Sequence, residues 1–497
     1  MKRAIPLLIL MTLLSSCSQK SADTAEDFVF LTENIDGDEG YYSKPAIITG
    51  DIAHRDVYPN TKEVSITLPF YDRVDNKQTS MIFDDRFAFS LLPYATRTVS
   101  MKPFIDHLVI CRGDSLHIEI DFAELGKVRY SGKGADNNIK LNLFHLRYYL
   151  PQDWPDEKQH ADAKSYSDAA KGKLEYHLSR LEDFVNEVKP SDELEKLCRK
   201  EIEADYYSEL IQSLLRLKRK GLDVSGYFKV KDSEPLFGKD CISGNLFDLA
   251  RNINIWLLDT MNQEDAERLM NDYSSLKRFI RKSTGNKMLR QMMMTHFYSM
   301  LLENNDTESF ENNFAYFNET VTYPLLKLNT RDRYVTKKAF KDNPRLLSDA
   351  ILNYDKPRDG QAKVRANEGL KLLRSVIEKA EDKVVYVNIG ATWCPGTQHE
   401  IPFLLELADT LKDEPLRIVN FYLDNGADGI NPFHLMIETY HLTEEQRIGL
   451  DPIFHTGRGI PFYILIDKEG VIVDFGEHLR PSIPETRDII DKHLQGR

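Results

Sequence analysis

The sequence predicts a multidomain protein with an all-β N-terminal part, a helical middle region and an α/β C-terminal part. Three patterns along the 497 residues support this. Short alternating apolar runs come first, long segments at helical spacing follow, and continuous apolar runs that alternate with helical segments come last. Because a domain usually takes about 100 to 200 residues, a chain of this length predicts more than one hydrophobic core.

The first residues have the layout of an export signal. Met1 to Arg3 is basic, "AIPLLILMTLL" is an apolar run too short to span a bilayer, and "LSSC" ends it at Cys17. The stretch resembles a bacterial lipoprotein signal, which implies that residues 1–16 are removed and that Cys17 is lipidated. A plain secretory signal is the alternative. Residues 17–27 are small and polar, as is typical of a flexible tether.

The lipoprotein resemblance also implies a location. Ser18 rather than Asp follows Cys17, which favours a lipid-anchored chain in the cell envelope at the outer membrane. The expected side is the periplasm, and the outer surface is the alternative. The net charge of -13 comes without a dense stripe of Lys and Arg. A nucleic-acid partner is therefore not expected.

The remaining cysteines, Cys111, Cys198, Cys241 and Cys394, have no metal-ligand spacing and are too few for a disulfide framework. No G-x-S-x-G, G-x-G-x-x-G or P-loop run occurs in the sequence. The sequence therefore supports neither a serine hydrolase nor a nucleotide-binding protein, and it predicts no metal ion or other cofactor.

Residues 28–133 predict a β-sandwich. In "GDSLHIEID", Leu116, Ile118 and Ile120 alternate with polar residues, which is typical of half-buried antiparallel strands. Further runs of the same kind, such as "EVSITLPF" and "RFAFSLL", are separated by residues that favour turns.

Residues 134–360 predict helices. "KLEYHLSRLEDFVNEV" places apolar residues on one stripe, and "SELIQSLLRLKRKG" ends on basic residues before Gly221, as helices do. "KMLRQMMMTHFYSMLLEN" is apolar nearly all round and predicts a buried helix, in which His296 is a core histidine rather than a ligand.

Residues 361–497 alternate strand and helix patterns. "KVVYVNIG" and "RIVNFYLD" are continuous apolar strands on either side of the helix in "TWCPGTQHEIPFLLELADTL". A connection with helical spacing, "NPFHLMIETYHLTEEQRIGL", leads to the strands "IPFYILID" and "VIVDFG" and to the helix in "SIPETRDIIDKHL". The order βαβ(α)ββα is that of a thioredoxin-like fold.

Several residues in this last part share one family pattern. Asn388 ends a strand, "ATW" precedes Cys394, Glu400 and Pro402 follow it, and "GIPFYILIDKEG" carries Pro461. In this order, residues 361–497 resemble the TlpA/ResA-like branch of the thioredoxin superfamily. The N-terminal β-region is similar to the domain that precedes such domains in Bacteroidota lipoproteins, which implies a recognition or spacer module.

The resemblance implies thiol-disulfide exchange on extracytoplasmic thiol-containing proteins. A cysteine at a helix N-terminus has a stabilised thiolate, so Cys394 would be the nucleophile. Glu400 matches a family glutamate that is a candidate proton relay. The resemblance also implies a substrate-binding surface, with a cis peptide bond before Pro461; its residues are Trp393, Pro395, Ile460 and Pro461.

Thr397 departs from the family pattern, because a second cysteine stands at that place in the family. A hydroxyl group cannot attack a mixed disulfide, so an external thiol reductant would have to resolve the Cys394 adduct, while Thr397 could donate a hydrogen bond to the thiolate. A distant cysteine of the same chain is the alternative resolving thiol. The alternative is a non-catalytic binding or scaffold lipoprotein. His399 precedes Glu400, but no histidine follows four places on, so the sequence predicts no zinc site there.

Overall fold

The computed structural model describes residues 44–57, 61, 63–68, 76–91, 93, 95–101, 104–124, 127–150, 154–259, 261, 273–303, 306–345, 368–379, 382–391, 394–423, 437–443, 446, 450 and 460–495. The predicted signal, the tether and Cys17 lie outside these residues. The described chain divides into two compact units. The first unit holds residues 44–299 and 313–330, and the second holds residues 300–312 and 331–495.

One sheet of the first unit has the strand order β4-β1-β7-β8. β1 pairs with β4 in antiparallel fashion but with β7 in parallel fashion, so the expectation of purely antiparallel strands was wrong. The alternation that predicted the strands reports burial and not strand direction, which explains the error. The strands are β1 (Ala46–Ala53), β4 (Arg86–Leu91), β7 (Ser115–Asp121) and β8 (Val128–Lys133).

The second sheet has the order β3-β2-β5-β6, and β9 pairs with β5. Alternate residues of both sheets, among them Ile48, Ile118 and Val99, share one hydrophobic core, so the two sheets pack through a common interior. The strands are β2 (Glu63–Leu68), β3 (Asn76–Met81), β5 (Thr96–Met101), β6 (Ile105–Ile110) and β9 (Cys241–Ile242).

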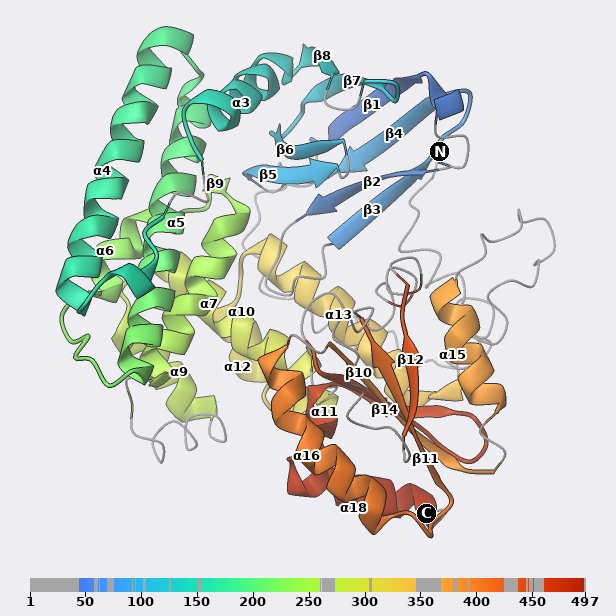
Figure 1. Cartoon of the computed structure of the whole chain (residues 1–497). Helices are drawn as coiled ribbons and strands as arrows, with labels where there is room; N and C mark the ends of the chain where they lie inside the picture. Colours follow the sequence, from blue (N-terminus) through green and yellow to red (C-terminus); the bar gives the residue numbers. More distant parts are fainter. Residues whose placement is uncertain are drawn as a thin grey trace. The chain divides into compact units, whose positions relative to one another are not determined.

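A helical region completes the first unit (Figure 1). Ser191 caps α5 by accepting a hydrogen bond from Leu194 N at 3.2 Å, and Gly221, in a left-handed conformation, follows its end. The helices are α3 (Ala135–Arg147), α4 (Ala163–Val188), α5 (Asp192–Arg219), α6 (Val230–Ser233), α7 (Gly244–Asp259), α9 (Tyr273–Ser283) and α12 (Phe314–Thr320). Short 3-10 turns lie at Arg55–Val57, Glu157–Gln159 and Glu234–Leu236.

Two further helices, α10 (Lys287–Glu303) and α13 (Pro324–Asp342), contribute residues to both units. The first-unit part of α10 is buried nearly throughout, as predicted. His296 is 8% exposed and its Nδ1 lies 3.1 Å from Asn254 Nδ2. Burial, with a smaller effect of Arg251, lowers the pKa of His296 to about 3, so its ring is a neutral core group.

The second unit contains a five-stranded sheet of order β12-β11-β10-β13-β14. β10, β11 and β12 are parallel, whereas β13 is antiparallel to β10 and β14 to β13. The strands are β10 (Val384–Gly390), β11 (Leu416–Tyr422), β12 (Glu438–His441), β13 (Phe462–Ile466) and β14 (Ile472–Phe475). The other elements are α11 (Thr307–Asn312), α15 (Glu368–Glu378), α16 (Pro395–Thr410), the turn η5 (Glu477–Leu479) and α18 (Pro484–Leu494).

The central strand β10 is buried at every residue, which explains its continuous apolar sequence. Val385, Val387 and Ile389 face a core that they share with α15. Val384 and Tyr386 face the opposite core, which they share with α16 and α18. Helices therefore cover both faces of this sheet, and α16 begins shortly after β10 ends.

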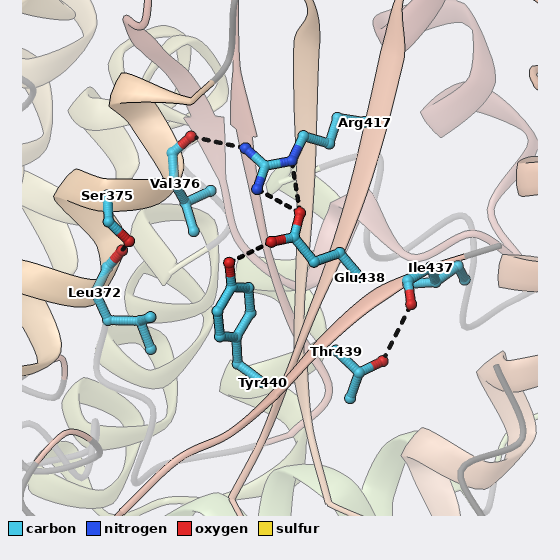
Figure 2. A network of polar contacts seen from close by, with 8 residues as sticks. All are labelled: Leu372, Ser375, Val376, Arg417, Ile437, Glu438, Thr439 and Tyr440. Carbon is cyan, nitrogen blue, oxygen red and sulfur yellow. Dashed lines mark hydrogen bonds and ion pairs between the residues drawn. The ribbon is translucent and has the colours of Figure 1, made fainter. Parts of the chain in front are cut away.

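β12 corrects the expectation that the connection after β11 is helical, since residues 438–441 form an edge strand. Figure 2 shows how this strand is held. Arg417 donates from Nε to Glu438 at 2.8 Å and from Nη1 to Val376 O at 3.1 Å, and Tyr440 also donates to Glu438. Burial opposes ionisation of Glu438, but these hydrogen bonds outweigh it and keep the pKa of Glu438 below its usual value. The network thus joins α15, β11 and β12.

Candidate functional site

The start of α16 holds the predicted nucleophile. Cys394 is the N-cap residue of this helix, with extended backbone angles, and its side chain is 9% exposed. Pro395 is the first helical residue and is exposed. A proline fits this place because the first helical N–H has no partner within the helix. Trp393 lies outside the described residues.

The Cys394 thiol lies against the segment that precedes β13. Its Sγ donates a hydrogen bond to Ile460 O at 3.3 Å, and the Ile460–Pro461 peptide bond is cis, as predicted. Gly396 allows this approach, because a Cβ there would lie 3.1 Å from Pro461 Cδ and 3.4 Å from Ile460 O. The fold therefore brings together Cys394, Pro395, Ile460 and Pro461.

Thr397 is buried at 1% exposure beneath the helix start. Its Oγ1 accepts a hydrogen bond from Ala391 N at 3.3 Å, so its hydroxyl contacts the chain that follows β10. A Cβ on Gly390 would lie 2.6 Å from Thr397 Cγ2, which means that this side chain fills the space above the glycine. The hydrogen bond that Thr397 could donate to the Cys394 thiolate stays a prediction, because the hydroxyl accepts from Ala391 and keeps its own hydrogen for a second partner.

Glu400 is buried at 4% exposure and is held by a loop distant in sequence. Its Oε2 accepts a hydrogen bond from Ser482 N at 3.0 Å, and its Oε1 accepts one from Ser482 Oγ at 2.8 Å. His399 Nδ1 lies 3.3 Å from Oε1, on a ring that is mostly exposed. Six residues of helix rise about 9 Å, which is the distance along the axis of α16 that separates Glu400 from Cys394.

The loop that carries Ser482 is itself fixed. Tyr386 OH donates to Leu479 O at 2.5 Å, and burial keeps the pKa of Tyr386 well above its usual value, so this hydroxyl remains a donor. Thr486 Oγ1 donates to Arg480 O at 2.8 Å. No local pattern in the sequence connects Ser482 with a glutamate 82 residues earlier, so this contact could not be predicted from the sequence.

Ser482→Ala is expected to lower the free energy of unfolding of the second unit by about 1 kcal/mol, because it removes one hydrogen bond to a buried carboxyl group. Hydrogen-exchange mass spectrometry of β10 peptides across a urea series measures this free energy of unfolding. The same substitution in a Glu400→Ala background should cost almost nothing. An equal cost in both backgrounds would show that Ser482 stabilises the loop without Glu400.

Among the described residues, no group of three or more His, Cys, Asp or Glu side chains is arranged to hold a metal ion. Cys111 is partly buried, and Cys198 and Cys241 are buried; all three are free thiols. Burial raises the pKa of the Cys241 thiol to about 12 and that of Cys198 well above its usual value, so neither of these two is poised to react. No helix in the described part of the chain is long and apolar enough to cross a membrane.

Comparison with known proteins gives matches among solved structures only. No family model matches the sequence, and no curated protein does. A crystal structure of a protein described as a thiol-disulfide oxidoreductase from Bacteroides vulgatus is 25% identical, with a TM-score of 0.20, over 23% of this chain and 80% of that one. A solution structure with the same description, also from Bacteroides vulgatus, is 26% identical, with a TM-score of 0.21, over 24% of this chain and 78% of that one.

A thiol:disulfide interchange protein of the thioredoxin family from Chlorobium tepidum TLS is 19% identical, with a TM-score of 0.21, over 24% of this chain and 83% of that one. These structural neighbours are thioredoxin-family thiol-disulfide oxidoreductases. The similarity is restricted to about a quarter of the chain.

Proposed function

We propose that residues 361–497, which lie in the second unit, form a thioredoxin-like domain of TlpA/ResA type that performs monothiol thiol-disulfide exchange through Cys394. One observation carries the proposal: the Cys394 thiol lies at the N-cap of α16, 3.3 Å from the carbonyl oxygen that precedes a cis-proline. The N-terminus of a helix presents unpaired N–H groups and a positive partial charge, which stabilise a thiolate. The strand order of the sheet, with β10 at its centre, and the position of α16 directly after β10 support the same fold.

The proposed exchange has two steps. The Cys394 thiol loses its proton and attacks a substrate disulfide; a Cys394–substrate disulfide forms, and the other substrate sulfur leaves as a thiolate that takes up a proton. An external thiol reductant then attacks this adduct, because the hydroxyl of Thr397 cannot. The attack falls on the substrate sulfur, so the bond between Cys394 and the substrate breaks, the Cys394 thiolate leaves and takes up a proton, and a new disulfide joins the external sulfur to the substrate sulfur.

Ile460 and Pro461 offer a backbone edge for the substrate. The segment before β13 lies beside the sulfur, where an extended peptide could pair with it. The substrates we propose are extracytoplasmic proteins with thiols or disulfides. Trp393 and Pro395 would flank the same peptide, and Glu400 would serve as a proton relay.

The proposed setting is the cell envelope. A lipid anchor on Cys17, after removal of residues 1–16, would hold the chain at the periplasmic face of the outer membrane. The two sheets of the first unit, proposed as a β-sandwich, and the helical region after them would act as a recognition or spacer part.

A second candidate function is a binding or scaffold protein without thiol chemistry. The low exposure of Cys394 favours it, as does the S–H hydrogen bond to Ile460 O, which a thiolate could not make. Under this reading the second unit presents a folded surface, and Cys394 is a packed side chain.

The decisive experiment captures mixed disulfides from an envelope extract on the purified mature protein and identifies them by mass spectrometry. We expect discrete partner proteins on the wild type and none on Cys394→Ala. Cys198→Ala is the matched control, since it removes a buried thiol of the first unit. Loss of fast iodoacetamide labelling near neutral pH should accompany the loss of adducts. Identical adduct patterns for wild type and Cys394→Ala would favour the scaffold function.

A further inference from the structure

The helix α5 carries a row of three carboxyl side chains on one face. Glu201, Asp205 and Glu209 stand four residues apart, so their side chains follow one another along the helix. Glu201 is 4% exposed, and the other two are partly buried. α3, α4 and α7 all pack against α5. Like charges in such a row destabilise one another when all three are ionised.

Asp205 connects three elements of the first unit. Tyr149, which follows α3, donates its hydroxyl hydrogen to Asp205 Oδ2. Asn245 in α7 donates from Nδ2 to Asp205 Oδ1 at 2.7 Å. A single carboxyl group therefore links the end of α3 and the start of α7 to α5. We name Asp205, Tyr149 and Asn245 the Asp205 cluster.

The charged groups that act on Asp205 from α5 and α7 are mostly of its own sign. Glu201, Glu209 and Asp248 each disfavour its ionisation. From α3, His145 faces the row at 3.5 Å from Glu201. From α4, the His177 ring lies edge-on to Tyr149, with ring centroids 5.0 Å apart.

Burial, with these carboxylates, raises the pKa of Asp205 to about 7, although the hydrogen bond from Tyr149 opposes the shift. The pKa of Tyr149 is also raised by burial, so its hydroxyl remains a donor. In the unfolded chain the Asp205 carboxyl would titrate near 3.8. At a pH between these two pKa values, Asp205 is protonated in the folded chain and ionised in the unfolded chain, so rising pH favours unfolding. Above about pH 7, Asp205 is ionised in both the folded and the unfolded chain, so its contribution to the free energy of unfolding no longer changes with pH.

We propose that the Asp205 cluster makes the stability of the layer formed by α3, α5 and α7 pH-dependent, so that this layer resists unfolding most strongly in acid and unfolds more readily as the pH rises to neutrality. This inference is independent of the Cys394 chemistry, because every group involved belongs to the first unit. It assigns a conformational property to a region for which the sequence indicated only helices.

The test compares the full-length wild type with Asp205→Asn. An asparagine can keep an oxygen for Asn245 and donate its N–H to the Tyr149 hydroxyl, so the contacts survive without the ionisable proton. Hydrogen-exchange mass spectrometry of α5 peptides across a urea series, at pH 5, 6, 7 and 8, gives the equilibrium constant for unfolding. In the wild type, we expect this unfolding constant to rise between pH 5 and pH 7. The ratio of the wild-type constant to that of Asp205→Asn should grow by up to about tenfold per pH unit.

Glu182→Gln is the matched control, because it removes a carboxylate from an exposed position of α4 and should follow the wild-type profile.

A second variant keeps the test decisive if Asp205→Asn folds poorly. Tyr149→Phe removes the hydrogen bond that favours the ionised form, so the pH range of the loosening should move upward. Parallel pH profiles for wild type and Asp205→Asn, or an unmoved profile for Tyr149→Phe, would overturn the proposal.

Discussion

Thr397→Cys is expected to give the protein a working dithiol. Residue 397 lies on the helix face that starts at Cys394, and residues three apart at a helix start are close enough for a disulfide. The pocket fits a cysteine, because Thr397 already fills it with two γ atoms beside Gly390. The variant should reduce insulin in the presence of dithiothreitol at least about tenfold faster than the wild type, which lacks the resolving thiol.

The controls for this prediction follow from the chemistry. Mass spectrometry of the oxidised variant should find a disulfide between Cys394 and the thiol introduced in place of Thr397, and Cys394→Ala/Thr397→Cys should be inactive. Thr397→Ser, which keeps a hydroxyl at this place, should stay at the wild-type rate. A disulfide that forms without any gain in insulin reduction would show that substrates cannot reach Cys394, and would favour the scaffold function.

Gly390→Ala should strongly destabilise the second unit. The added Cβ would lie 2.6 Å from Thr397 Cγ2 and 2.9 Å from its Oγ1, and Thr397 cannot easily turn away because β-branched side chains are stiff. We expect a loss of about 1 to 3 kcal/mol in the free energy of unfolding, the usual cost of overpacking. Hydrogen exchange of the β10 peptides across a urea series measures it.

The clash has a specific rescue. Thr397→Ala removes both γ atoms, so Gly390→Ala should cost much less in that background than in the wild type. Iodoacetamide labelling of Cys394 should also change in the single variant, because the displaced helix start carries the thiol. Equal costs in both backgrounds would mean that Gly390 is required for a reason other than its contact with Thr397.

The sequence predicted the elements that decide the Cys394 site. Continuous apolar strands identified β10 and β11, and Pro395 together with the apolar pattern after it marked the start of α16. These are local signals, and each depends on residues within one element. The cis bond before Pro461 was predicted from the family resemblance and is confirmed.

The features that the sequence missed depend on contacts between distant residues. Ser482 reaches Glu400 only because the loop before α18 folds back onto α16. The edge strand β12 pairs with β11, and Arg417 of β11 binds Glu438 of β12; these contacts between separate segments outweigh the helical spacing of the sequence. The Asp205 cluster likewise joins Tyr149, Asp205 and Asn245 from separate segments.

The parallel pairing of β1 with β7 has a consequence for the kinetics of folding. β1 lies between β4 and β7, and partners such as Thr49 and His117 are 68 residues apart in the chain. Contacts between such distant residues raise the contact order and slow the folding of a domain, since a long loop must close first. Until β7 has been made, one edge of β1 has no partner, and an unpaired edge can recruit strands from other chains.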